Sequence, residues 1–271
     1  MRNPLHIAIW ILLGSILVTP NTSRADFIVN GNFGTFATSG TGIFNNSSQG
    51  FYTYDAGAVG IQGWTVLDTS IDVYGQFTGT WQSPPGGTYG LDLMGTNGNN
   101  TGSTVPQYGG VSQTVTGLTP GQTYQLSFQH SVNSSADPNA QNPVGGLPDY
   151  EKSRTLDIAI LDASDNPVSG LSPTGTGTVV ADGHVQYTLL TGTRTPNNME
   201  WLGDAVTFAA PTSSLTIQFS TAQFSDPTLS LDRSGPALGV VSLIAVPEPA
   251  SLGIIALASS LLLMRRRRVS L

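Results

Sequence analysis

The sequence predicts an all-β protein, a sandwich of two antiparallel sheets. Three observations lead to this fold class. Short apolar stretches alternate with polar residues at a period of two, turn-forming clusters separate these stretches, and no amphipathic helix of useful length occurs. Around ten or eleven short strands of this kind in one chain are typical of a β-sandwich.

The alternation is clearest in three segments, 123–130, 155–161 and 214–220. Each places three large apolar side chains on one face and polar side chains on the other, as a half-buried strand requires. Further strands are expected at 27–29, 63–67, 71–74, 89–93, 110–115, 186–190, 201–209 and 239–244. Long polar loops are expected at 34–50, 95–107 and 133–154. Such loops either carry a functional site or are tolerated insertions, and the sequence favours neither interpretation over the other.

The first 25 residues have the composition of a secretory signal peptide. Arg2 precedes an apolar run from Leu5 to Val18, and Ser23 and Ala25 supply small residues before a cleavage site. Cleavage after Ala25 would leave a mature chain that starts at Asp26. The alternative, an N-terminal membrane anchor, is disfavoured because Pro20 and polar residues follow the run directly.

The last 26 residues, 246–271, form a second distinctive segment. The uncharged stretch 250–264 would span about 22 Å as a helix, less than the roughly 30 Å of a bilayer core. A short transmembrane helix is therefore expected, and the basic residues after it should stay cytoplasmic. These are Arg265, Arg266, Arg267 and Arg268. Before the helix, Pro247 and Pro249 keep the chain around Glu248 extended.

This order of Pro-Glu-Pro, short apolar helix and arginine cluster resembles the PEP-CTERM sorting signal of Gram-negative bacteria. The resemblance implies processing by an exosortase at Pro247, Glu248 and Pro249, in cells that typically make exopolysaccharide. It also implies a precursor that crosses the inner membrane once, with a periplasmic body and a mature form at the cell surface or outside the cell. The alternative is an ordinary C-terminal membrane anchor.

The charge of the body, residues 26–245, limits its partners. Between Asp26 and Met264 the chain has seventeen acidic and four basic residues, a net charge of −13, although the whole chain carries −7. Such a surface repels phosphate backbones, so nucleic acid is not an expected partner. The chain contains no cysteine, which excludes thiol catalysis and cysteine-based zinc sites.

Five short segments are spread over the body in a characteristic order: "VNGNF", "GWTV", "YGLDLMG", "GGVSQTVTGLTPGQTYQLSF" and "GPALGVVSLI". In these segments the body resembles choice-of-anchor C and related galactose-binding-like jelly rolls, which are similar to carbohydrate-binding modules. The resemblance implies a jelly-roll-like β-sandwich over 26–245. Relatives often carry two carboxylates that help to hold a structural calcium, whereas this chain has Gly34 and Gly239 at those positions. We therefore expect that site to be empty or very weak, and we expect no cofactor or metal.

No catalytic motif is apparent in the body. His130 ends a strand on its apolar face, so a packed histidine at the edge of the core is expected, and His184 lies far from it in sequence. A glycosidase would need two neighbouring carboxylates, for which Asp149 with Glu151 and Glu200 with Asp204 are conceivable. We expect these acids to be solvated surface residues.

Aromatic side chains give the candidate binding site. Tyrosine and tryptophan faces stack on sugar rings while polar neighbours bond the hydroxyls. Tyr52 and Tyr54 are expected in a loop and Trp81 in an exposed irregular segment, so these three form the predicted carbohydrate platform. Their alternative role is loop packing against the sandwich. Trp64 and Trp201 are expected to be core residues at strand starts.

The sequence therefore favours a secreted, non-catalytic β-sandwich that is associated with exopolysaccharide or biofilm and binds carbohydrate. Two alternatives remain open at this stage. One is a secreted polysaccharide hydrolase, and the other is a purely structural matrix or adhesion protein, which the loss of the calcium carboxylates slightly favours over binding.

Overall fold

The computed structural model describes residues 25–47, 50–75, 81–95, 108–133, 153–190, 192–222 and 235–247. The predicted transmembrane segment, Glu248, Pro249 and the four C-terminal arginines lie outside these ranges, as do Asp149 and Glu151. Of the residues predicted to border the terminal signals, Ala25 and Pro247 are described, and both are exposed. Within the described ranges, no helix has the length and apolar character needed to cross a bilayer.

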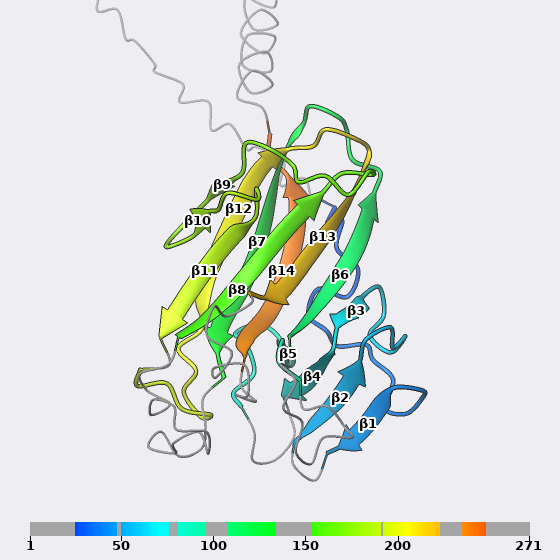
Figure 1. The fold of residues 1–271 in the computed structure, drawn as a ribbon, viewed down its shortest axis with the longest axis vertical. Coiled ribbons are helices and arrows are strands. Elements are labelled where there is room, and N and C mark those ends of the chain that lie inside the picture. The colour runs from blue at the N-terminus through cyan, green and yellow to red at the C-terminus, as the bar shows by residue number, and fades with distance from the viewer. Residues whose placement is uncertain are drawn as a thin grey trace, which may run out of the picture.

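The predicted all-β sandwich is confirmed: the described residues form fourteen strands in two antiparallel sheets that face each other (Figure 1). The larger sheet has the order β1-β2-β4-β5-β14-β7-β12-β9. Its strands are β1 (Ile43–Asn46), β2 (Phe51–Asp55), β4 (Ser70–Gly75), β5 (Tyr89–Asp92), β14 (Pro236–Ala245), β7 (Thr123–Val132), β12 (Leu202–Ala209) and β9 (Ser172–Pro173).

The smaller sheet has the order β10-β11-β8-β13-β6-β3. Its strands are β10 (Thr178–Val179), β11 (Val185–Leu190), β8 (Ser153–Leu161), β13 (Ser214–Thr221), β6 (Gly109–Thr116) and β3 (Thr65–Asp68). From β5 to β8, and again from β12 to β14, successive strands lie in alternate sheets. This repeated crossing gives the sandwich its jelly-roll-like connectivity.

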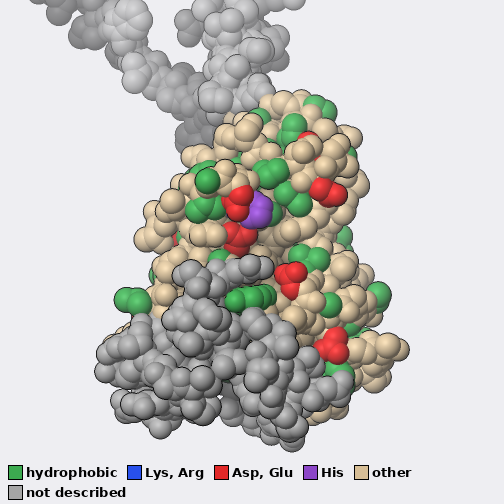
Figure 2. All heavy atoms as spheres, in the orientation of Figure 1, with side chains coloured by type: hydrophobic (Ala, Val, Ile, Leu, Met, Phe, Trp, Pro, Cys, Tyr) green, Lys and Arg blue, Asp and Glu red, His purple; other side chains and the backbone are tan. Residues whose placement is uncertain are grey.

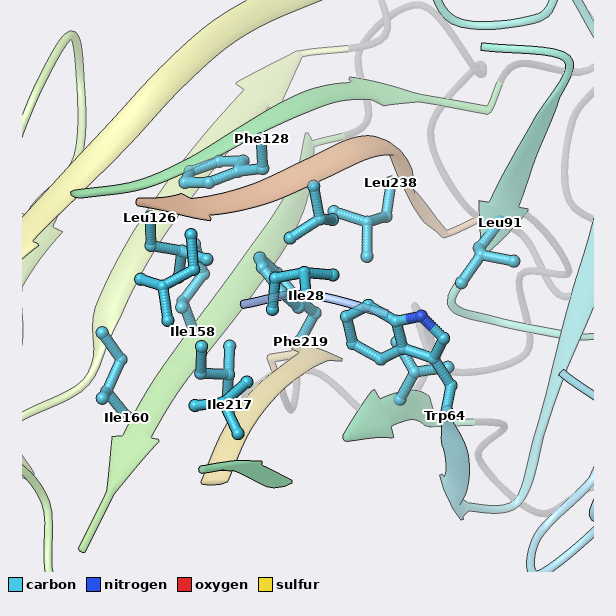
Figure 3. Close-up of a cluster of buried hydrophobic side chains, with 14 of the residues drawn as sticks. Ile28, Trp64, Leu91, Leu126, Phe128, Ile158, Ile160, Ile217, Phe219 and Leu238 are labelled. Carbon is cyan, nitrogen blue, oxygen red and sulfur yellow. The ribbon is translucent and has the colours of Figure 1, made fainter. Parts of the chain in front are cut away.

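The core lies between the two sheets and follows the predicted alternation (Figure 3). Leu126 and Phe128 of β7 face Ile158 of β8 and Phe219 of β13, and each of the four side chains is at most 2% exposed. The rings of Phe128 and Phe219 are 5.7 Å apart. Trp64 is 4% exposed beside the start of β3, so the prediction that it is a core residue is confirmed.

Two local expectations were wrong. Residues 27–29 form no strand; the Phe27 N–H bonds to the Leu243 carbonyl (3.0 Å), and the Asp26 carboxylate accepts the N–H of Leu243 (2.9 Å). The expected loop 34–50 contains β1, which pairs with β2. Because Phe51 to Tyr54 are buried on both faces of β2, the strand has no alternation of polar and apolar residues by which to detect it.

The two ends of the body lie side by side through these contacts. Phe27 and Asp26 bond to Leu243, and the Gln122 side chain donates to the Val246 carbonyl (2.6 Å). Pro247 follows directly and is exposed. The end of β14 is thus tied to the sandwich up to the residue before the Pro-Glu-Pro segment.

Candidate functional site

A shallow pocket of about 410 Å³ lies on the outer face of the larger sheet, over β14, β7 and β12. We call it the trough. It is lined by Ser127, Phe128, Gln129, Thr174, Gly203, Asp204, Ala205, Val240 and Ser242. The face is hollow because short side chains stand at its outward positions, including Ser127 on β7, Ala205 on β12 and Ser242 on β14.

Gly203 and Gln129 form part of the floor of the trough. A Cβ added to Gly203 would meet no atom within 4 Å, so the space above this residue is open. The Gln129 Nε2 donates to the Pro85 carbonyl (2.9 Å). Its Oε1 is buried and, among the described residues, has no hydrogen-bond partner. The floor therefore combines an open backbone surface with the hydroxyls of Ser127 and Ser242.

Trp201 lies beside the trough, at Gly239. A Cβ added to Gly239 would lie 3.1 Å from both the Gln129 Cβ and a Trp201 ring carbon, and 2.6 Å from the Pro84 Cβ. The indole Nε1 of Trp201 donates to the Gln82 carbonyl (3.2 Å), which fixes the orientation of the ring. Because the ring is half-buried, part of it stays open to solvent. Trp201 is thus a border residue of the outer face, not the core residue that we expected.

Trp81 belongs to the same face. Trp81 lies in a segment without regular secondary structure, as expected. Its side chain is nevertheless half-buried against Tyr74 (ring centroids 5.3 Å apart) and Phe51 (6.5 Å). Phe51, Tyr74, Met199 and Ala237 form a small buried cluster under Trp81 and Trp201. Two tryptophans that are distant in sequence therefore share one apolar support on the outer face.

The structure does not bring Tyr52 and Tyr54 to this face. Both lie in β2, not in a loop, and they are 8% and 0% exposed. Because strand residues alternate between faces, these tyrosines point into the core while Phe51 points toward Trp81. The Tyr54 hydroxyl donates to the Ala37 carbonyl, and the Tyr52 ring packs on Phe36 (5.8 Å). Buried rings offer no face to a sugar, so a platform of all three residues does not form.

His130 is 1% exposed, which confirms the prediction of a packed histidine. Its Nε2 lies 2.9 Å from Asp204 Oδ2. Burial lowers the pKa of His130, while the hydrogen bond and the charge of Asp204 raise it. Asp204 also accepts a hydrogen bond from the Thr174 hydroxyl (3.1 Å), and its side chain is only 10% exposed. The expectation that Asp204 is a solvated surface acid is therefore wrong.

The other described acid of the proposed pair, Glu200, does lie at the surface. Its side chain is 41% exposed, accepts a hydrogen bond from the Thr193 hydroxyl (3.1 Å) and lies 3.9 Å from the Arg194 guanidinium. Asp204 instead faces the histidine. These contacts give Glu200 and Asp204 separate structural partners.

A histidine beside acidic side chains marks the outer face of the smaller sheet (Figure 2). His184 Nδ1 lies 2.7 Å from Asp157 Oδ2 and 3.9 Å from Asp182 Oδ2. The Gln186 amide donates to the other oxygen of Asp157 (2.9 Å). This second histidine–aspartate pair lies on the opposite face of the sandwich from the trough.

Neither Gly34 nor Gly239, the two positions where the sequence resemblance implies calcium-binding carboxylates, has a side-chain oxygen. A carboxylate at position 239 would start from a Cβ 2.6 Å from that of Pro84, so the segment that contains Pro84 would have to shift to admit it. Nowhere in the described ranges do three histidine, cysteine or acidic side chains gather as a metal-binding group.

No protein-family model matches the chain, and no curated protein matches it. Solved structures with a similar arrangement include the enzymatically active domain of tailspike protein 4 of bacteriophage CBA120, with 13% identity and a TM-score of 0.36. That match covers 68% of this chain and only 20% of the tailspike chain.

Two smaller proteins are covered almost completely. TmCBM61, solved with β-1,4-galactotriose, is 12% identical over 82% of this chain and 99% of its own, with a TM-score of 0.41. A xylan-binding domain of the CBM 22 class is 14% identical over 72% of this chain and 95% of its own, with a TM-score of 0.35.

Proposed function

We propose that this protein is an exported, non-catalytic carbohydrate-binding β-sandwich and that the trough is its binding surface. The observation that carries the proposal is the open floor at Gly203 beside the half-buried ring of Trp201. Sugar rings need an apolar contact together with hydrogen-bonding groups for their hydroxyls. The trough provides both, because Val240 and Ala205 lie next to the hydroxyls of Ser127 and Ser242.

The charge of the body selects among polysaccharides. With a net charge of −13 between Asp26 and Met264, the protein repels polyanions at low ionic strength. In the trough, Asp204 is the single charged residue of the lining. The proposed ligand is therefore a neutral polysaccharide chain, and the shallow open form suits an internal stretch of such a chain.

Substitution at Gly203 tests the proposal most directly. Because a Cβ added at this position meets no atom within 4 Å, we expect Gly203→Gln to place its side chain in the trough without disturbing the packing. On an array of immobilised neutral polysaccharides, we expect Gly203→Gln to weaken binding of the full chain at least tenfold. Trp201→Ala should weaken it as well, because it removes the ring at the border.

The matched control places the same side chain on the other sheet. Thr188 is exposed on β11 in the smaller sheet, and Thr188→Gln should leave binding unchanged. Equal binding by Gly203→Gln and the parent chain would exclude the trough. Binding to acidic polysaccharides in preference to neutral ones would contradict the proposed ligand class.

We further propose that the chain is exported and that an exosortase processes its C-terminal segment, which delivers the body to the cell surface or matrix among exopolysaccharide. The exposed position of Pro247 supports this, since a protease needs access to the adjoining segment. Mass spectrometry of surface material, from cells with and without the sorting protease, provides the test. Recovery of the peptide with Arg265 to Arg268 on the mature surface protein would contradict processing.

A further inference from the structure

The last strand of the sandwich is hydrogen-bonded on both of its edges where the chain leaves the body. On one side, residues 241–245 of β14 are paired with residues 124–128 of β7. On the other side, the Leu243 N–H donates to the Asp26 carboxylate (2.9 Å), and the Leu243 carbonyl accepts the Phe27 N–H (3.0 Å). Leu243 is also 0% exposed, so detaching this end of β14 would open the core.

Gln122 holds the last residue of this bonded stretch. Val246 donates its N–H to the Thr123 carbonyl (2.9 Å), and the Gln122 Nε2 donates to the Val246 carbonyl (2.6 Å). Gln122 is itself fixed, because its N–H donates to the Thr119 carbonyl (3.1 Å) and its carbonyl accepts the Ala210 N–H (3.0 Å). The body therefore satisfies both backbone polar groups of Val246.

The bonding stops at Pro247 for a chemical reason. Proline has no N–H, so this residue cannot continue the ladder, and it is exposed. Only residues 247–249 separate Val246 from the uncharged stretch 250–264, a distance of about 10 Å when extended. The boundary between bonded and exposed chain thus falls at the start of the Pro-Glu-Pro segment.

This boundary decides which peptide bonds a protease can reach. Cleavage within a folded strand follows the population of the locally opened state, because the backbone must first leave its hydrogen-bonded neighbours. Opening the end of β14 breaks the bonds of Leu243 and Val246 and exposes core side chains, so this population is small. Pro247 is already exposed and has no N–H to release.

We propose that the contacts of Asp26 with Leu243 and of Gln122 with Val246 act as a clasp that sets the upstream boundary for removal of the C-terminal segment. Asp26 and Gln122 are positioning residues in this process: they keep every peptide bond up to the Val246–Pro247 bond out of reach, so the body loses its tail and keeps β14 intact. Cleavage then breaks one peptide bond beyond Pro247. With water as the acceptor, the body keeps the new carboxyl group and the departing peptide keeps the new amino group. This role of the clasp rests on the proposed processing of the C-terminal segment.

Two variants each remove one half of the clasp, Gln122→Ala and Asp26→Ala. Gln186→Ala is the matched control, because Gln186 is also half-buried and its amide donates a side-chain hydrogen bond, to Asp157 (2.9 Å). Gln186 belongs to β11 in the smaller sheet, so the control removes a similar contact away from β14.

The first measurement is limited digestion of the full chain, purified in mild detergent, with a protease of broad specificity. Mass spectrometry of the fragments maps the cuts. In the parent chain, cuts within residues 241–246 should be at least about tenfold slower than removal of the segment after Pro247. Gln122→Ala and Asp26→Ala should each raise the cleavage rate within 241–246 about fivefold, which is the effect of one lost hydrogen bond on the opened population. Gln186→Ala should keep the parent rate.

The second measurement identifies the last residue of the mature body in cells that contain the sorting protease, and we expect Pro247 or a later residue. A parent body that ends at Val246 or earlier would overturn the clasp. Equal digestion of the parent chain and both clasp variants would do the same, as would a rate in Gln186→Ala that matches the rate in Gln122→Ala.

Failure of the proposed processing gives a different result. If the mature surface protein retains Arg265 to Arg268, the tail is not removed, and the digestion map still decides whether the clasp protects β14. If one clasp variant does not fold, the other variant and the control decide the question.

Discussion

The Nε2 atom of His130 lies 2.9 Å from Oδ2 of Asp204, across the neighbouring strands β7 and β12. The histidine is almost completely buried, and its ring also contacts Tyr187 (centroids 5.0 Å apart). Burial disfavours the charged imidazolium and lowers the pKa of His130 below its ordinary value, although Asp204 opposes the shift. In its neutral form the ring donates a hydrogen bond to the carboxylate.

This contact predicts a loss of stability in mild acid. In the unfolded chain His130 titrates near about 6.5, and in the folded chain it titrates lower. As the pH falls below about 6.5, the unfolded state takes up the proton first, so the free energy of unfolding decreases until the folded pKa is passed. Urea denaturation at pH 8 and at pH 5.5 measures the difference.

The variant His130→Gln should lose this component of the pH dependence, because it removes the titrating ring. His184→Gln is the matched control, since it removes a histidine from the outer face of the smaller sheet, and it should keep the dependence. An unchanged pH dependence in His130→Gln would show that another group is responsible.

The close packing around Gly239 predicts that a side chain at this position lowers the stability of the protein. Aspartate at this position, which similar jelly rolls often carry, would bring a Cβ to 2.6 Å from that of Pro84 and to 3.1 Å from a Trp201 ring carbon. The segment that contains Pro84 would have to move, so we expect Gly239→Asp to lower the free energy of unfolding by about 1–3 kcal/mol. Gly203→Ala, where the added Cβ meets nothing, should change it by less than about 0.5 kcal/mol. Equal values for the two variants, in urea denaturation, would contradict the close packing at Gly239.

The sandwich could be predicted because most of its strands have one buried face. Leu126 and Phe128 in β7, like Ile217 and Phe219 in β13, alternate with partly exposed polar residues, and this is the pattern that the period-two analysis detects. In β2 the rule fails, since a strand buried on both faces hides its alternation. That failure placed Tyr52 and Tyr54 in a loop.

The position of Trp201 on the outer face could have been predicted from the same alternation of strand residues. Val206 and Phe208 face the core, so the odd-numbered residues of the segment, from Trp201 to Gly203 and Ala205, belong to the outer face. The trough could not be predicted in this way, because it forms only where β14, β7 and β12 lie next to one another in the sheet. For the same reason the contact of Gln122 with Val246 appears only once the pairing of β7 and β14 is known.

Trp64 and Trp81 differ in burial, and this difference predicts how much stability each alanine substitution costs. Trp64 is 4% exposed and packs between Phe33 (5.4 Å) and Phe219 (6.3 Å), with its Nε1 donating to the Asn30 carbonyl (3.2 Å). Trp64→Ala should therefore leave a large cavity and lower the free energy of unfolding by about 3–5 kcal/mol.

Trp81 offers the matched comparison, because it is half-buried and rests on Tyr74 from one side of the sheet. Its truncation removes an aromatic contact of about 0.5–1.5 kcal/mol and some apolar area, but solvent can fill the space that remains. We expect Trp81→Ala to cost clearly less than Trp64→Ala in urea denaturation. A cost for Trp81→Ala equal to that of Trp64→Ala would mean that Trp81 is a structural residue of the fold, and would remove it from the candidate binding face.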